Sequence, residues 1–315
     1  MNRKAIIFGI KGYKLTKKER LLFKRYKPWG VILFTRNIKS IFQLKNLVND
    51  IKGIFKDKNY PVLIDEEGGK VSRLKNIIDL SFFSQSFFSK IYIKDRNLFY
   101  KFYEIYINQI CNIFHSVGIN INTVPVLDVR RKKSHKIIGS RSFSTNPGVV
   151  KELGNICVDL YNKNKIATVS KHIPGHGLAN SDSHFKTPIV TSSKKKLKQN
   201  DFKPFINSKS LFSMTAHVVY KKYDHLFTAT HSNFIIKKVI RGYIKFNGIL
   251  ISDDISMKSL KFKIEKNAIL ALKAGCNLVL HCNANMSEMT KLAKVVPNID
   301  IFTQKKTSQF YKFLR

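Results

Sequence analysis

The sequence predicts one TIM-type (β/α)8 barrel that forms a single domain over residues 1–315. Short apolar segments alternate eight times with stretches of helical length, a pattern typical of a parallel sheet surrounded by helices. The length suits one barrel, because such barrels need roughly 250 residues plus insertions. No Pro- or Gly-rich linker divides the chain. A doubly wound open sheet stays as the alternative, because a sequence pattern cannot show that a sheet closes.

In chain order, the eight expected strands are 5–8, 30–34, 62–64, 120–124, 167–170, 211–215, 248–251 and 278–280. Three segments carry helix-start signals: the capping boxes at 16–19 and 40–43, and the Asn-Pro pair at 146–147. The polar, lysine-rich segment after Ile299 is expected to form a last helix.

The chain carries 57 lysines and arginines against 20 acidic residues, a net charge of +37. Lys, Asn, Ile and Phe are all abundant, as coding from A/T-rich DNA would produce, and the basic residues are spread along the whole chain. A dedicated nucleic-acid-binding protein usually concentrates its charge on one element. We therefore expect compositional drift and no specific nucleic-acid partner, with some non-specific binding to polyanions.

The cysteines are widely spaced and form no CxxC motif, so we expect buried free thiols and not a disulfide framework. They are Cys111, Cys157, Cys276 and Cys282. The apolar run at the N-terminus stops at Gly9, which is too short for a secretion signal. No stretch approaches 18 apolar residues, so no membrane insertion is expected. The expected compartment is the cytoplasm.

Acidic residues are concentrated directly after the expected strands, where the active site of a parallel barrel lies. Seven of the 20 acidic residues occupy such positions: Asp65, Glu66, Glu67, Asp128, Asp182, Asp253 and Asp254. Carboxylates at the mouth of a barrel can hold sugar hydroxyls, bind a metal or attack an electrophilic carbon.

The segment 171–184 combines histidines, a lysine and an aspartate with glycines and a proline that favour a shaped loop. Zinc is one interpretation, since the segment offers four possible ligands: His172, His176, Asp182 and His184. No uninterrupted helix presents two of these histidines at i, i+4, so we expect no metal. Asp182 and His184 instead fit a carboxylate that orients an imidazole base.

Longer motifs carry a family resemblance. The most specific is K-H-x-P-G-H-G at 171–177, followed by D-S-H at 182–184. Supporting motifs are I-L-F-T-R-N at 32–37, D-x-E-G-G-x-V-x-R at 65–73, P-V-L-D-V at 125–129, I-G-x-R-S at 138–142 and G-x-x-x-S-D-D-x-S-M at 248–257. From Ala5 to Cys282, the chain resembles the bacterial β-N-acetylglucosaminidases of glycoside hydrolase family 3, which act in cell-wall recycling.

The resemblance implies a retaining exo-enzyme that needs no cofactor and removes non-reducing N-acetylglucosamine from β-1,4-linked peptidoglycan fragments. Asp253 matches the catalytic nucleophile, His184 the general acid/base and Asp182 its partner. The residues that match the sugar-binding set are Asp65, Arg73, Arg141, Lys171 and His172. His176 and His217 are expected to shape the same pocket. If His184 is not the proton donor, Glu67 is the first alternative.

Other functions stay open. One is a different family 3 β-glycosidase; another is a phosphorylase, because phosphate can enter beside a neutral imidazole. A third is a non-catalytic, polyanion-binding barrel that has lost its activity; the net charge favours it, but the joint presence of Asp253, Asp182 and His184 opposes it. The expected partner is a small-molecule substrate, a muropeptide or anhydro-muropeptide whose carboxylates suit a cationic barrel mouth, bound by a monomer.

Overall fold

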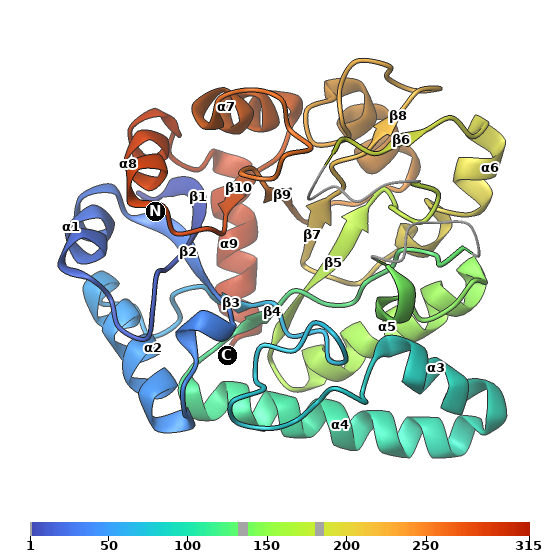
Figure 1. The fold of residues 1–315 in the computed structure, drawn as a ribbon, viewed down its shortest axis with the longest axis horizontal. Coiled ribbons are helices and arrows are strands. Elements are labelled where there is room, and N and C mark those ends of the chain that lie inside the picture. Colours follow the sequence, from blue (N-terminus) through green and yellow to red (C-terminus); the bar gives the residue numbers. More distant parts are fainter. Residues whose placement is uncertain (1, 132–137, 180–185) are drawn as a thin grey trace.

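The computed structural model describes residues 2–131, 138–179 and 186–315, in which parallel strands close into a barrel surrounded by helices (Figure 1). Around the barrel the strand order is β1-β2-β3-β4-β5-β7-β9-β10, and β10 pairs with β1. The strands are β1 Lys4–Gly9, β2 Pro28–Leu33, β3 Val62–Ile64, β4 Ile121–Asn122, β5 Ala167–Ile173, β7 Phe212–Thr215, β9 Ile249–Asp254 and β10 Leu278–His281. The closed ring confirms the predicted barrel and excludes an open sheet, and each barrel strand overlaps an expected segment.

Helices follow most of the strands and cover the outside of the barrel. They are α1 Lys17–Tyr26, α2 Ile41–Phe55, α3 Gln85–Lys94, α4 Arg96–Val117, α5 Pro147–Lys163, α6 Lys194–Gln199, α7 Ile264–Ala274, α8 Met286–Val295 and α9 Ile301–Phe313. The last of these is the helix expected after Ile299.

Two of the three predicted helix starts are present in full. At α1, the Thr16 hydroxyl accepts the Glu19 N–H at 3.2 Å, and the Glu19 carboxylate accepts the Thr16 N–H at 2.8 Å. Asn146 caps α5 with its side-chain oxygen. At α2 only half of the capping box forms, because Ser40 caps the helix while the Gln43 side chain accepts the N–H of residue 39.

Three features of the fold were not expected from the sequence. Two helices, α3 and α4, lie between β3 and β4. A π-helix, Ile235–Tyr243, lies between β7 and β9. A separate pair of short strands, β6 Ile189–Val190 and β8 Val219–Tyr220, forms outside the barrel (Figure 1).

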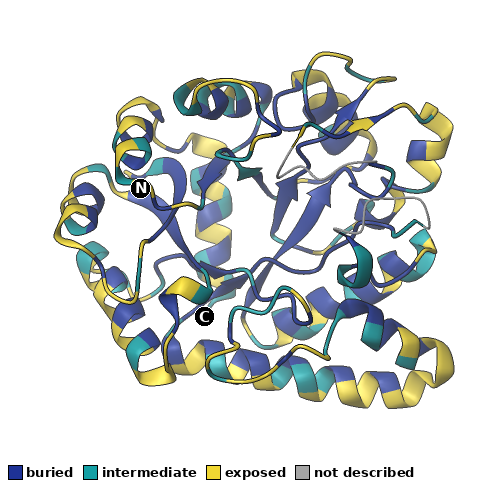
Figure 2. Ribbon diagram, in the orientation of Figure 1, coloured by how far each residue is buried: buried dark blue, intermediate teal, exposed yellow. Residues whose placement is uncertain are grey.

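The C-terminal helix α9 packs against the end of the barrel where the strands begin. Trp29 of β2, Phe212 of β7 and Phe310 of α9 form one buried aromatic cluster, with ring centroids 5.5–6.4 Å apart. The Trp29 indole also donates to the hydroxyl of Thr307 at 2.9 Å. Figure 2 shows the buried residues lining the barrel interior and the inner faces of the helices. One end of the barrel is therefore covered, and the pocket described below lies at the other.

All four cysteines are free, as expected. Three are buried, but Cys282 is only partly buried, because it follows β10 at the rim and lines the pocket. Within the described ranges, no helix combines the length and apolarity needed to cross a bilayer.

Candidate active site

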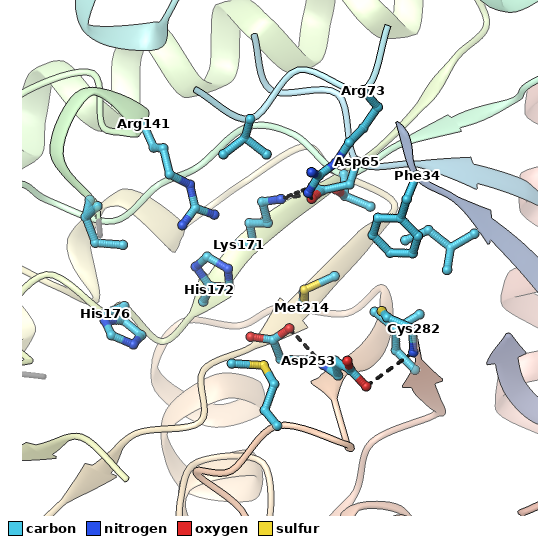
Figure 3. A pocket seen from close by; sticks show the side chains of 17 residues that line it. Phe34, Asp65, Arg73, Arg141, Lys171, His172, His176, Met214, Asp253 and Cys282 are labelled. Carbon is cyan, nitrogen blue, oxygen red and sulfur yellow. Dashed lines mark hydrogen bonds and ion pairs between the residues drawn. The ribbon is translucent and has the colours of Figure 1, made fainter. Parts of the chain in front are cut away.

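A pocket of about 860 Å³, partly open to solvent, lies where the barrel strands end (Figure 3). Six residues of the predicted site line it: Asp65, Arg73, Arg141, Lys171, His172 and Asp253. Segments that are far apart in the chain are thus brought together by the closure of the barrel. The other two predicted residues, Asp182 and His184, lie outside the residues that the structure describes.

Asp65, which follows β3, is the centre of a dense polar cluster. Its carboxylate accepts from the ammonium of Lys171 at 2.5 Å and from the guanidinium of Arg73 at 2.6 Å. The Thr123 hydroxyl donates to it at 2.5 Å. Burial alone would raise the pKa of Asp65, but Lys171 and Arg73 hold that pKa well below its usual range. The carboxylate is therefore ionised and positioned to accept hydrogen bonds.

Glu67, which is buried, extends the cluster. It accepts two hydrogen bonds from the Arg141 guanidinium at 2.7 and 2.8 Å, and it lies 2.6 Å from the ammonium of Lys171. Burial would raise the pKa of Glu67, but the charges of Arg141 and Lys171 outweigh burial and lower the pKa. An ionised carboxylate held in this way carries no proton to donate. The structure therefore argues against Glu67 as the alternative proton donor.

Asp128 holds the histidine segment that ends β5. Its carboxylate lies 2.7 Å from Nδ1 of His172 and accepts the backbone N–H of His176 at 2.6 Å. Although burial acts to raise it, the pKa of Asp128 is lowered to about 2 by His172 and His176. Burial lowers the pKa of His176 to about 4, so that imidazole is neutral. Sequence reasoning placed Asp128 at the rim but did not pair it with His172.

Asp253 and Asp254 lie at the end of β9 and line the pocket, but their carboxylates make different hydrogen bonds. Asp254 accepts the N–H and the hydroxyl of Ser256 at 3.0 and 2.8 Å, so its carboxylate stabilises the turn. Among the described residues, the Asp253 carboxylate accepts one hydrogen bond, from the N–H of Asp254 at 2.8 Å. Asp253 is not a helix N-cap, because α7 begins only at Ile264. Its carboxylate is thus available to a bound molecule.

The charge state of Asp253 depends on the groups around its carboxylate. Burial alone would raise the pKa of Asp253, but His217, His172, the Asp254 N–H and Lys171 together lower it. Figure 3 shows Asp253 across the pocket from Asp65 and Lys171. An anionic carboxylate that faces a set of polar groups can attack or stabilise an electron-poor carbon held between them.

His217 lies behind the pocket wall and not on its surface. It is buried, with Nδ1 2.7 Å from the Thr230 hydroxyl and Nε2 3.0 Å from the carbonyl oxygen of Asp254. Burial lowers its pKa. The expectation that His217 shapes the pocket is met only indirectly, through support of β9, whereas His176 lines the pocket itself.

The described side chains offer no evident metal site. Within the described ranges, no group of three or more His, Cys, Asp or Glu residues has an arrangement that could hold a metal ion. Of the four ligands considered for zinc, His172 and His176 are described, and His172 is already bonded to Asp128. The prediction that no metal is needed stays a prediction.

Comparison with known proteins gives consistent matches over the whole barrel. The model of the glycosyl hydrolase family 3 N-terminal domain matches residues 5–312. A β-hexosaminidase of Idiomarina loihiensis is 31% identical over 288 residues, covering 88% of this chain and 83% of that protein.

Two crystal structures of NagZ from Neisseria gonorrhoeae share the fold. The complex with N-trifluoroacetyl-D-glucosamine has a TM-score of 0.87 at 27% identity and covers 100% of this chain and 91% of that one. The complex with a zinc ion has a TM-score of 0.84 at 28% identity, with coverage of 99% and 90%. The chain described here belongs to glycosyl hydrolase family 3, within its β-N-acetylhexosaminidases, and is a glycoside hydrolase.

Proposed function

We propose that this enzyme removes non-reducing N-acetylglucosamine from β-1,4-linked peptidoglycan fragments in the cytoplasm, with retention of configuration. The observation that carries the proposal is the ionised Asp253, across the pocket from the Asp65, Lys171 and Arg73 cluster. The relative from N. gonorrhoeae binds an N-acylated glucosamine, N-trifluoroacetyl-D-glucosamine. Both facts suit a glucosamine ring held between the cluster and Asp253.

In the proposed first step, Asp253 attacks the anomeric carbon and the bond from that carbon to the leaving oxygen breaks. His184 donates its proton to that oxygen, and a covalent glycosyl-enzyme forms. In the second step, His184 takes a proton from water, which attacks the anomeric carbon and releases Asp253. Asp182 holds the His184 ring and stabilises the imidazolium. The roles of Asp182 and His184 rest on the family motif, because both residues lie outside the described ranges.

The binding residues have complementary roles. Asp65 offers acceptors to sugar hydroxyls, while Arg73 and Arg141 offer donors. Lys171 contributes by holding Asp65 in place, since its ammonium contacts Asp65, Thr123 and Glu67. His172, whose Nδ1 is engaged by Asp128, presents its other ring nitrogen for a further hydrogen bond. The muropeptide portion, which is the leaving group of the reaction, carries carboxylates. A cationic surface therefore favours the approach of the substrate.

Incubation with N-acetylglucosaminyl-anhydro-N-acetylmuramic acid, with products identified by mass spectrometry, tests this function. Free N-acetylglucosamine should appear at the same rate with and without phosphate, and a strong chelator should not slow the reaction. N-Acetylglucosamine 1-phosphate would instead identify a phosphorylase. An uncleaved substrate, together with salt-dependent retention on DNA, would favour a non-catalytic barrel.

The leaving-group dependence of His184→Ala tests the proposed proton donor. A sugar leaving group needs a proton, whereas an activated aryl group does not. The variant should therefore lose about 10²–10⁴-fold in kcat/KM on the disaccharide and much less on an activated aryl glycoside. The covalent intermediate should accumulate on the aryl substrate, and Asp182→Asn should give a milder version of both effects. Equal losses on the two substrates without an intermediate would contradict the assignment, and His172 with Asp128 would become the next candidate.

A further inference from the structure

Behind the histidine segment lies a buried carboxyl that the proposed mechanism does not use. Asp201, between α6 and β7, is fully buried. Within the described parts of the chain, neither of its carboxyl oxygens makes a hydrogen bond of normal geometry, although the N–H of Leu178 lies close enough to act on its pKa. Burial of a carboxyl without well-formed hydrogen bonds is costly, so its presence calls for an explanation.

The backbone of the histidine segment lies directly against Asp201, and two glycines make this approach possible. A Cβ atom on Gly175 would lie 2.6 Å from the carbonyl oxygen of Asp201. A Cβ atom on Gly177 would lie 2.9 Å from Oδ1 of Asp201. No side chain therefore separates this carboxyl from the segment that carries His176.

The same segment is fixed from two other directions. The carboxylate of Asp128 accepts the N–H of His176 at 2.6 Å and also orients the His172 ring. The hydroxyl of Tyr220 donates to the carbonyl oxygen of Gly175. Asp128, Tyr220 and Asp201 thus surround residues 175–177.

Asp201 is uncharged in this environment at neutral pH. Burial raises the pKa of Asp201 to about 8, and the negative charge of Asp128 acts in the same direction. The cations of Arg131 and Lys196 and the N–H of Leu178 act in the opposite direction without overcoming burial. The hydroxyl of Tyr220 also interacts electrostatically with Asp201. It is itself neutral, because burial raises its pKa well above the ordinary value.

We propose that Asp201 is a positioning residue that holds residues 175–177, and through them His176 and His172, only while its carboxyl is uncharged. Ionisation would place a second negative charge near Asp128 and directly against the backbone of residues 175–177. The carboxylate of Asp128 would then be displaced from the two histidines that it orients. This inference rests on the proposed glycosidase function, because its readout is turnover of an N-acetylglucosaminide.

The test is the pH dependence of kcat/KM on an activated aryl N-acetylglucosaminide. This substrate needs no proton from the enzyme, so titration of the general acid does not obscure the result. Wild-type kcat/KM should fall about tenfold between about pH 7 and about pH 9. Asp201→Asn is neutral and of similar shape, so it should stay within about twofold of wild type at about pH 7 and show no fall near pH 8.

Tyr220→Phe is the matched control, because it loosens the same segment without changing a charge near neutral pH. It should lower kcat/KM but keep the fall near pH 8. A second measurement does not depend on folding of the Asn variant: in wild-type protein labelled with ¹³C at the aspartate carboxyls, one resonance should titrate near pH 8.

Three results would overturn the inference: a fall that persists at the same pH in Asp201→Asn, a flat wild-type profile, or no aspartate that titrates near pH 8. A wild-type enzyme that cleaves no N-acetylglucosaminide at any pH would instead contradict the proposed function. Failure of the inference and failure of the function can therefore be told apart.

Discussion

The ammonium of Lys171 lies within 2.6 Å of two carboxylates, those of the partly buried Asp65 and the buried Glu67. Although burial acts to lower it, the pKa of Lys171 is raised by Asp65 and Glu67, so the cation persists at neutral pH. The carboxylate pKa values are lowered in return. The stability that these carboxylates contribute is therefore present above their unfolded-state pKa of about 4 and is lost as pH falls through the lower folded values.

Replacement of Lys171 by Met should destabilise the fold as well as the site. Removal of one partner from a buried ionic cluster typically costs about 3–5 kcal/mol, because the remaining charges stay buried. Denaturant unfolding at neutral pH should show a loss of that order, together with loss of kcat/KM. Lys70→Met is the matched control, since Lys70 is exposed, and its unfolding free energy should change by no more than about 0.5 kcal/mol. Equal effects of the two substitutions would contradict the role given to Lys171.

At the scale of elements, the turn after β5 is shaped by the space available to its backbone. A Cβ atom on Gly177 would collide with the carbonyl oxygen of Val129, whereas a Cβ atom on Gly12 would meet nothing within 4 Å. The difference lies in the packing around each glycine and not in the residue type. Substitutions at Gly177 and Gly12 therefore compare a constrained loop directly with an unconstrained one.

Gly177→Ala should displace the turn and cost about 1–3 kcal/mol of unfolding free energy, as overpacking usually does. Because His176 precedes Gly177, kcat/KM on the disaccharide should also fall by about tenfold or more. Gly12→Ala should leave both quantities within experimental error of wild type. A Gly177→Ala enzyme with normal activity would show that the turn does not need this close approach.

The elements that the sequence predicts well are those with a local signal. Most barrel strands contain a short apolar run, because both of their faces are buried, and Thr16 and Asn146 mark helix starts through their own side chains. The helices α3 and α4 also carry local signals, which were overlooked, since the side chains of Ser84 and Asp95 cap them. The strands β6 and β8 have two residues each and lack such a signal.

The candidate site, too, could be predicted from the sequence only in part. Family motifs bring Asp65, Lys171 and Asp253 to attention, and the barrel places all three in one pocket. The bridge from Lys171 to Glu67 and the burial of Asp201 depend on contacts between segments that are far apart in the sequence. The spacing of residues along the chain does not predict such contacts, so only the structure reveals them.

At the scale of the whole molecule, the net charge of +37 sets how charged ligands approach. Muropeptides are anionic, so the surface should attract them, and salt should screen this attraction. We expect kcat/KM on an anionic muropeptide to fall about three- to tenfold between low and high salt. A neutral aryl glycoside is the control, and its kcat/KM should change by less than about twofold. Equal salt dependence of the two substrates would show that the charge has no part in substrate capture.

Peptide mapping of enzyme treated with a slow N-acetylglucosaminide inactivator shows directly whether Asp253 forms the covalent intermediate. Asp253 has a lowered pKa and few protein partners, whereas Asp254 is bonded to Ser256. One sugar adduct per chain is expected, on Asp253, and none in Asp253→Ala, which should also lack turnover. An adduct on Asp254, or near-normal turnover by Asp253→Ala, would contradict this role of Asp253.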